Sequence, residues 1–241
     1  MEWIDNGYIL SQKTFSEQAL ILDVFTKNHG RARGIVKGSR KKFLNSLQVG
    51  IGGKIVWKAR LEEHLGNFTI DPQFNLLPFL YLTPSKLLLI QSLTTILRFT
   101  LPEKQPYPHF FSCFEDFLTK TLLKTDSIEV AKDYIQLEKN LLNTLGFALD
   151  ITKCALTGSH EDLAYVSPKT GKACTKTSGE PYKDILLKLP DFLGLNTAIA
   201  TQEDIKNGLH LTGHFLEKHF FMEKQKSFLS LRESISRSLT F

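Results

Sequence analysis

LILDVFTKNHGRARGIVK, residues 20–37, is the stretch that decides the fold of the first third of the chain. Its first seven residues are rich in the apolar and β-branched side chains that favour strands, and Lys27–Gly30 supplies a turn. Residues 31–37 can form a second strand, in which the odd positions share one face. The stretch therefore predicts a β-hairpin whose second strand is basic.

Short segments on both sides of this hairpin also have strand character. Residues 7–10 are apolar, and residues 53–59 and 67–70 are rich in residues that favour strands. No helical pattern of any length interrupts these segments, so we expect four to five strands in the first third of the chain. A small closed sheet accommodates such strands, and the five-stranded OB-fold barrel is one common solution. We place this domain at residues 1–80.

The basic strand continues into a basic loop, so residues 31–42 contain six cations and no acidic residue. These cations are Arg31, Arg33, Lys37, Arg40, Lys41 and Lys42. A run of charge is often only a solvated surface, but residues 1–80 carry eleven Lys and Arg against seven Asp and Glu, a net charge of +4. Residues 81–241 carry nineteen against eighteen, a net charge of +1. A basic surface confined to one module is the pattern expected of a protein that binds phosphate backbones.

Aromatic residues in the same module suggest base stacking. OB barrels bind nucleic acids with a basic groove and with aromatic side chains that stack on bases. Phe43 directly follows the cations of a predicted loop, so it is the aromatic residue that we expect to contact a base. The other aromatic residues considered are Phe25, Trp57 and Phe68, and most of these are expected in the core.

Helical periodicity begins at Pro84, which stands near a plausible first turn. The expected helices cover residues 86–99 and 109–123, a third opens at Asp126 in the manner of a capped N-terminus and is closed by Gly146, and two more follow Thr201. The fold class is therefore α+β: an N-terminal five-stranded OB-fold barrel followed by a mostly α-helical domain, residues 81–241. An insertion at residues 150–190 breaks the helical pattern with Ser, Thr, Gly, Pro and Lys.

The insertion contains two short knuckles that resemble half of a zinc site. Their end residues are Cys154 and Thr157 in the first knuckle, and Cys174 and Thr177 in the second. Two C-x-x-C knuckles would supply four thiolates, but two thiolates and two neutral hydroxyls do not close a structural zinc site. We therefore expect a degenerate zinc-finger-like segment held by packing and hydrogen bonds, with no metal and no other cofactor.

Composition and motifs exclude several classes of protein. At 241 residues with 42% apolar content, the chain is long enough for two modest domains with real cores. No apolar run approaches the ~18 residues that span a bilayer, no secretory signal is present, and three cysteines form no disulfide framework, which predicts a soluble cytoplasmic protein. The sequence has no P-loop, dinucleotide-binding G-x-G-x-x-G motif or G-x-S-x-G elbow, so we do not expect an enzyme.

Two groups of residues occur in an informative order. The first runs from Gly7-x-Ile9-Leu10 through Glu17-x-x-Leu20-Ile21-Leu22-x-Val24-Phe25-Thr26 to His29-Gly30-x-x-x-Gly34-Ile35-Val36-Lys37-Gly38-Ser39-Arg40. The second is Ser167-Pro168-Lys169-Thr170-Gly171, between the two knuckles. Together they resemble the RecO family of DNA repair and recombination mediator proteins. Thr157 and Thr177 stand where metal-binding members have cysteines, so the resemblance does not carry over a zinc site.

This resemblance implies an N-terminal OB fold, a central helical domain and a zinc-finger-like insertion. It also implies binding to single- and double-stranded DNA, strand annealing, and cooperation with a RecR-like mediator. Recombinase loading onto strands coated by single-stranded DNA-binding protein is implied as well. The acidic tail of that coating protein needs cations beside an apolar pocket, and Lys132 and Lys139, one heptad apart on the third helix, are candidates. The alternative is that these lysines lie on a solvated helix face.

The resulting hypothesis is a non-enzymatic DNA-binding mediator of recombinational repair, with no membrane partner. The alternative is an adaptor protein whose basic barrel binds an acidic protein partner. Strand annealing separates the two, because only the first requires contact with nucleic acid.

Overall fold

The protein is described by a computed structural model that divides into two compact units, Met1–Thr119 and Lys120–Phe241. In the part of the chain that the structure describes, the first unit holds a barrel and two helices, and the second holds three main helices and a small sheet. The described residues are 1–38, 47–61, 63–76, 78, 83–194, 200–221 and 226–239. None of the helices within these ranges is long and apolar enough to cross a membrane.

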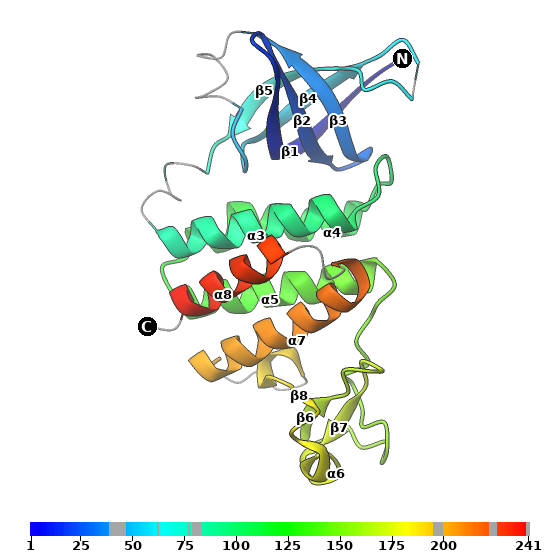
Figure 1. The fold of residues 1–241 in the computed structure, drawn as a ribbon, viewed down its shortest axis with the longest axis vertical. Helices are drawn as coiled ribbons and strands as arrows, with labels where there is room; N and C mark the ends of the chain where they lie inside the picture. Colours follow the sequence, from blue (N-terminus) through cyan, green and yellow to red (C-terminus); the bar gives the residue numbers. More distant parts are fainter. Residues whose placement is uncertain are drawn as a thin grey trace. The chain divides into compact units, whose positions relative to one another are not determined.

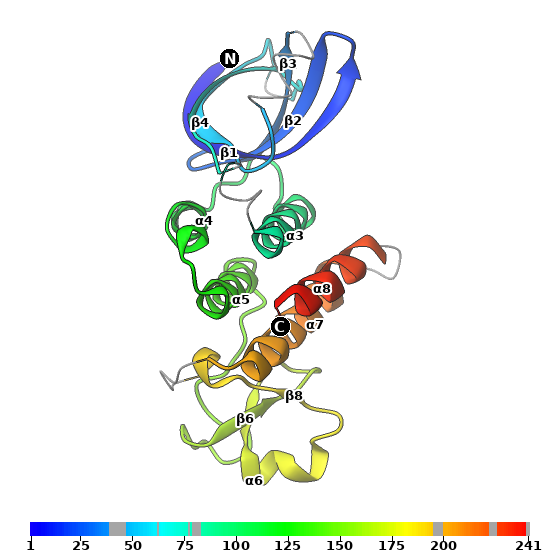
Figure 2. The same cartoon turned by 90° about the vertical axis from the view of Figure 1, so that its left-hand side faces the viewer.

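The first unit begins with five strands that close into a barrel, seen as a ring in Figure 2. The strands are β1 (Glu2–Ser16), β2 (Ala19–Thr26), β3 (Gly30–Lys37), β4 (Gly52–Lys58) and β5 (Asn67–Phe74). Their order around the barrel is β1-β2-β3-β5-β4, and every neighbouring pair is antiparallel except β3 with β5. The closed five-stranded barrel predicted from the sequence is therefore confirmed, and it is OB-like.

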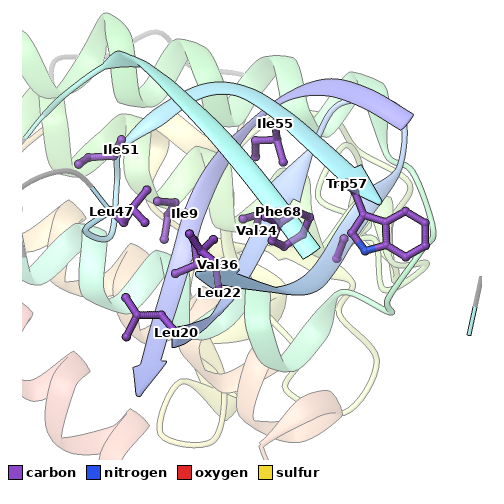
Figure 3. Close-up of a cluster of buried hydrophobic side chains, with 11 residues drawn as sticks. Ile9, Leu20, Leu22, Val24, Val36, Leu47, Ile51, Ile55, Trp57 and Phe68 are labelled. Carbon is purple, nitrogen blue, oxygen red and sulfur yellow. The ribbon is translucent and has the colours of Figure 1, made fainter. Parts of the chain in front are cut away.

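The barrel is filled by apolar side chains from all five strands, shown in Figure 3. Buried and accessible positions alternate along β3, and the accessible ones are Arg31, Arg33, Ile35 and Lys37. This alternation confirms the predicted face of odd positions. Gly34 points inward and has no space for a side chain, because a Cβ there would lie 2.7 Å from the Phe68 ring. Trp57, Phe25 and Phe68 are buried, as predicted.

Strand β1 extends well beyond the apolar residues 7–10 that the sequence indicated. Its second half, residues 11–16, is polar except for Phe15 and mostly exposed, yet it pairs with β2 as far as Ser16 opposite Ala19. Backbone hydrogen bonds form this part of the hairpin. Because no apolar side chains need to be buried there, no hydrophobic pattern marks it in the sequence.

Two helices in the described part of the first unit lie beside the barrel in Figures 1 and 2. They are α3 (Pro84–Thr100) and α4 (Pro108–Thr119), close to the expected ranges, and residues 121–123 form the separate 3₁₀ turn η1 (Thr121–Leu123). Aromatic rings join α4 to the barrel: Tyr8 lies 5.6 Å from Phe114, and Phe25 lies 5.2 Å from Phe111, between centroids. The compact unit thus ends at Thr119, and the domain boundary expected at residue 80 stays a proposal.

The second unit is built on three helices, α5 (Ser127–Thr144), α7 (Gln202–Phe220) and α8 (Lys226–Leu239). The Asp126 carboxylate caps α5 by accepting hydrogen bonds from two backbone N–H groups, as the sequence predicted. Thr201 and Asp204 form a capping box at the start of α7. A buried ion pair joins α8 to α5, with Arg232 Nη1 lying 2.5 Å from Glu138 Oε1.

The predicted insertion is a small subdomain between α5 and α7. It contains β6 (Leu163–Val166), β7 (Ala173–Thr175), α6 (Lys176–Gly179), η2 (Glu180–Tyr182) and β8 (Leu187–Lys188), followed by η3 (Asp191–Leu193). The strands form a sheet in the order β7-β6-β8. In the described part of the chain, no group of three or more His, Cys, Asp and Glu is arranged to hold a metal ion. The structure therefore supports a small sheet here but gives no support to a zinc finger.

Candidate nucleic-acid interface

Arg31 is the most enclosed of the predicted cations on the outer face of β3. Its guanidinium donates to the Asp23 carboxylate at 2.8, 2.9 and 3.1 Å and to the Leu101 carbonyl at 3.1 Å. The Arg31 side chain is 15% exposed and that of Asp23 is 6% exposed. Arg31 therefore fastens the segment after α3 to the barrel, and its charge is balanced within the fold. Its predicted role as a direct DNA contact stays a prediction, which these contacts do not favour.

Arg33 is more accessible, but it also belongs to a network of ion pairs. Its Nε lies 2.7 Å from Glu103 Oε1, while half of its side chain remains exposed. Arg31 lies 3.8 Å from the same glutamate, and Arg98 Nε lies 3.7 Å from Asp23 Oδ2. Three arginines and two carboxylates therefore form one cluster with a net charge of +1. Counting cations in the sequence overestimates the free positive charge at this end of the strand.

Lys37 lies at the opposite end of β3, where the side chain is exposed. It pairs with Ala19, next to the tip of the β1–β2 hairpin. The tip also presents Lys13 and Phe15, and the aromatic ring of Phe15 is 60% exposed. We call this surface, formed by Lys13, Phe15 and Lys37, the hairpin end of the barrel. An exposed aromatic ring with two cations in the same region has the chemistry of a base-stacking site.

The remaining predicted contacts, Arg40, Lys41, Lys42 and Phe43, lie outside the described residues. The chain enters that segment beside the hairpin end, because the Gly38 N–H donates to the Gln18 carbonyl at 3.0 Å. Their assignment as DNA contacts stays a prediction. Sequence reasoning missed Phe15, although a lone aromatic residue within the polar run 11–18 was a visible signal.

A pocket of about 400 Å³ opens at the other end of β3, and we call it the mouth pocket. Trp3, His29 and Trp57 line it as a stack of nearly parallel rings. The centroids of Trp3 and His29 are 4.4 Å apart with planes at 9°, and those of Trp3 and Trp57 are 5.7 Å apart with planes at 13°. Trp57 Nε1 donates to the Leu65 carbonyl at 3.1 Å, which fixes the β4–β5 loop at the rim. The mouths of β-barrels are frequent ligand sites.

Asp5 holds the β2–β3 turn that carries His29. The Asp5 side chain is 2% exposed, and its carboxylate accepts hydrogen bonds from the backbone N–H groups of Asn28 at 2.7 Å and His29 at 3.1 Å. It also lies 3.0 Å from His29 Nδ1 and 2.9 Å from Asn28 Nδ2. Burial alone would raise the pKa of Asp5, but these hydrogen bonds to the charged form hold the pKa below its ordinary value.

The four knuckle residues differ in their exposure. Cys154 and Cys174 are buried, whereas Thr157 and Thr177 are exposed. Burial alone would raise the pKa of the Cys154 thiol, but hydrogen bonds from Thr157 and from neighbouring backbone N–H groups lower it to about 6. Burial and the charge of Cys154 raise the pKa of Cys174. The first knuckle is therefore organised by hydrogen bonds to one sulfur atom.

Lys132 and Lys139 both lie half-buried on α5. Lys132 Nζ lies 2.7 Å from Glu129 Oε1, and burial lowers the pKa of Lys139. These surroundings differ from those of a fully solvated helix face. The role of the two lysines in binding an acidic protein tail stays a prediction.

The fold and the site together define an OB-barrel protein with the features of a nucleic-acid binder. The family model described as "Recombination protein O N terminal" matches residues 1–71, and that described as "Recombination protein O C terminal" matches residues 82–228. The chain belongs to the RecO family of DNA repair proteins.

Curated relatives are similar over nearly the whole chain. The DNA repair protein RecO of Rhizobium leguminosarum bv. trifolii is 37% identical over 223 residues, which cover 92% of this chain and 86% of the relative. The protein of the same name from Sinorhizobium medicae is 35% identical over 234 residues, covering 97% and 92%. That from Methylobacterium nodulans is 36% identical over 225 residues, covering 91% and 90%. The resemblance inferred from the sequence motifs is confirmed.

Proposed function

We propose that this protein is a non-enzymatic, DNA-binding mediator of recombinational repair, working in the cytoplasm. It promotes the annealing of complementary strands and helps to load the recombinase onto single-stranded DNA coated by single-stranded DNA-binding protein. Membership of a family of DNA repair proteins supports this function. The observation that carries it is the hairpin end, where exposed lysines and an exposed aromatic ring stand beside the entry to a further basic run.

The proposed mechanism is neutralisation of phosphate charge followed by base contact. Lysine and arginine side chains that displace counterions bind single and double strands without regard to sequence. Two complementary strands held on one cationic surface repel each other less, so they pair faster. Lys37, Arg40, Lys41 and Lys42 supply the charge in this proposal, and Phe43 joins Phe15 in stacking on bases.

The arginines at the other end of β3 have a different part in the proposal. Half-exposed Arg33 can reach a phosphate while it keeps its contact with Glu103. Arg31 acts as a positioning residue, because its guanidinium is occupied by Asp23 and the Leu101 carbonyl.

The second unit supplies protein contacts in this proposal. A RecR-like mediator and the acidic tail of single-stranded DNA-binding protein are its partners, and Lys132 and Lys139 are proposed to receive the tail. The small sheet of residues 150–190 is proposed as a zinc-finger-like fold without metal. The Cys154/Thr157 and Cys174/Thr177 knuckles support this last point, because two thiolates and two neutral hydroxyls do not close a structural zinc site.

A triple variant tests the DNA site. Replacing Arg40, Lys41 and Lys42 with Ala removes three charges, so the slope of log affinity against log salt falls by about two for single strands and by nearly three for duplex. The matched control removes the same charge from the exposed lysines of the small subdomain, Lys153, Lys172 and Lys176. Fluorescence anisotropy of labelled oligonucleotides over a range of salt concentrations measures both slopes. A triple variant with an unchanged slope, or a control with an equal loss, would contradict the assignment.

Strand annealing tests the function itself. Complementary oligonucleotides with a fluorophore and a quencher report pairing directly, and the protein is expected to accelerate it at low to moderate salt. If annealing is no faster with the protein than without it, the mediator function fails. The adaptor alternative, with an acidic protein bound to the barrel, would then be favoured.

A further inference from the structure

The mouth pocket is a second feature of the barrel that the proposed function does not use. Its volume of about 400 Å³ falls within the range of ~300–1,000 Å³ typical of small-ligand sites. The pocket lies inside one compact unit and is formed by β1, β3, β4, the loops between strands and the segment after α3. Trp3 is the middle ring of the stack and Trp57 is buried, whereas the His29 side chain is 37% exposed, so His29 is the accessible end of the stack.

The walls of the pocket suit a flat ring. Trp3, His29 and Trp57 already form a stack with planes within 13° of parallel. The Asp5 carboxylate holds His29 in place through hydrogen bonds to the β2–β3 turn and to the His29 ring. The ring stack is therefore already formed before a ligand binds. Aromatic surfaces of this kind stack on nucleobases regardless of sequence, because every base has a π-face.

The charges around the pocket favour a neutral occupant. The charged side chains on the rim are Arg33, Lys104, Glu2, Glu63 and Glu103. Glu103 pairs with Arg33 at 2.7 Å, and Glu2 pairs with Lys58 at 3.0 Å. A phosphate or carboxylate would therefore meet little net positive charge inside, whereas an uncharged base would have apolar walls and polar groups at its edge.

Strand β3 connects the hairpin end to the pocket. Strand β3 has eight residues, so its ends are roughly 23 Å apart at a rise of ~3.3 Å per residue. A single strand that leaves the hairpin end along β3 reaches the rim of the pocket after a few nucleotides. Half-exposed Arg33 lies at the rim of the pocket and can contact the DNA backbone there.

We infer that the mouth pocket binds one unstacked nucleobase of single-stranded DNA, which stacks on the His29 end of the ring stack that Trp3 supports. This inference rests on the proposed DNA-binding function and adds a base-specific contact to it. Duplex DNA does not satisfy the pocket, because its bases are stacked and paired.

The protein contains a direct reporter of this binding. The chain has two tryptophans, and both line the pocket. A short oligodeoxythymidine of about ten nucleotides, within the ~4–16 nucleotides that an OB fold covers, is therefore expected to quench the intrinsic tryptophan fluorescence. An abasic oligonucleotide of the same length and charge is the matched control, because it keeps the phosphates and lacks the bases.

Two variants separate stacking from folding. Trp3→Leu is expected to weaken oligodeoxythymidine binding by roughly tenfold or more, and Trp3→Phe is expected to restore most of the affinity. Neither change should alter binding of the abasic strand. Thermal unfolding of both variants shows whether the barrel is intact, and Trp57 still reports on the pocket in each.

The outcomes distinguish the inference from the proposed function. Quenching by the thymidine strand alone, with a selective loss in Trp3→Leu, supports the base pocket. If both strands bind by anisotropy but neither quenches, or both quench equally, the base pocket is overturned while DNA binding stands. If neither strand binds, the proposed function fails and the pocket inference fails with it.

Discussion

Replacing Arg31 and Lys37 separately should produce opposite results, although both are cations on the same face of β3. Arg31→Met removes a guanidinium that makes three contacts with Asp23 at 2.8–3.1 Å, in a pair whose side chains are 15% and 6% exposed. Lys37→Met removes an exposed ammonium group. We therefore expect the first change to reduce stability and the second to reduce DNA binding.

The magnitude for Arg31→Met follows from its partner. Removing one member of a buried ion pair costs about 3–5 kcal/mol, because the other charge is left without compensation. Here the pair keeps some exposure, and Arg98 remains 3.7 Å from Asp23. We expect a loss of about 2–3 kcal/mol, which corresponds to a fall in Tm of roughly 5–10 °C. Lys37→Met should change stability by no more than about 0.5 kcal/mol.

The salt dependence of binding to single-stranded DNA provides the complementary measurement. Lys37→Met should lower the slope of log affinity against log salt by about 0.7, the contribution of one neutralised phosphate. Arg31→Met should leave the slope unchanged. If Arg31→Met proves too unstable to measure, Arg31→Lys preserves the charge but loses the forked contact with Asp23, and should also leave the slope unchanged.

One pattern of results would refute this reasoning. Suppose that Arg31→Met has the same Tm as the original protein and that its slope of log affinity against log salt is lower by about 0.7. Arg31 would then contact a phosphate directly. The ion pair with Asp23 would then have no structural importance.

Three further changes test other parts of the structure. Asp5→Asn should cost about 2–4 kcal/mol, because an amide cannot replace a carboxylate that accepts several hydrogen bonds. The pKa of Asp5 is lower in the folded state, so the ionised carboxylate stabilises the fold above about pH 4. This stabilisation disappears as the pH falls through the pKa of Asp5 in the folded state. The stability of Asp5→Asn should therefore fall less steeply with decreasing pH. Arg232→Met should lower the free energy of unfolding, measured with denaturant, by about 3–5 kcal/mol, because it leaves Glu138 buried without its partner. Adding Glu138→Leu should restore much of that stability. Phe15→Ser should weaken binding to single strands by about fivefold or more and leave Tm unchanged.

Each of these three predictions has a contrary outcome. Equal acid sensitivity in Asp5→Asn and the original protein would show that another carboxylate governs acid unfolding. A double variant of Arg232 and Glu138 no more stable than Arg232→Met would show that packing and not charge compensation decides the cost. Unchanged affinity in Phe15→Ser would remove this ring from the interface.

Most of the fold was predictable because its signals are local. Strand and helix periodicity located every strand of the barrel, and the Asp126 cap marked the start of α5. The extension of β1 to Ser16 was not predictable in this way, since its polar residues are held by backbone pairing. The small sheet of the insertion has strands of four residues or fewer, too short for a periodic pattern.

The candidate site was less predictable, because its charges are paired by contacts distant in sequence. The Lys27–Gly30 turn sets a hairpin register in which Asp23 lies opposite Arg33, beside Arg31, so this carboxylate was within reach of sequence reasoning. Glu103 was not, because it reaches Arg33 from the segment after α3. The mouth pocket likewise depends on three rings that only barrel closure brings together.

The separation of charge and aromatic surface along β3 has a consequence for annealing. In the proposed function, the cations of the hairpin end contact phosphates, which single strands and duplex both present. The mouth pocket, in our inference, accepts a base only when that base is unpaired. Pairing of two bound strands then withdraws the base from the mouth pocket and loses the stacking contribution, while the phosphate contacts persist. For the same number of phosphate contacts, the protein therefore binds the duplex product more weakly than it binds a single strand. The duplex product is then released more readily than the unpaired substrate.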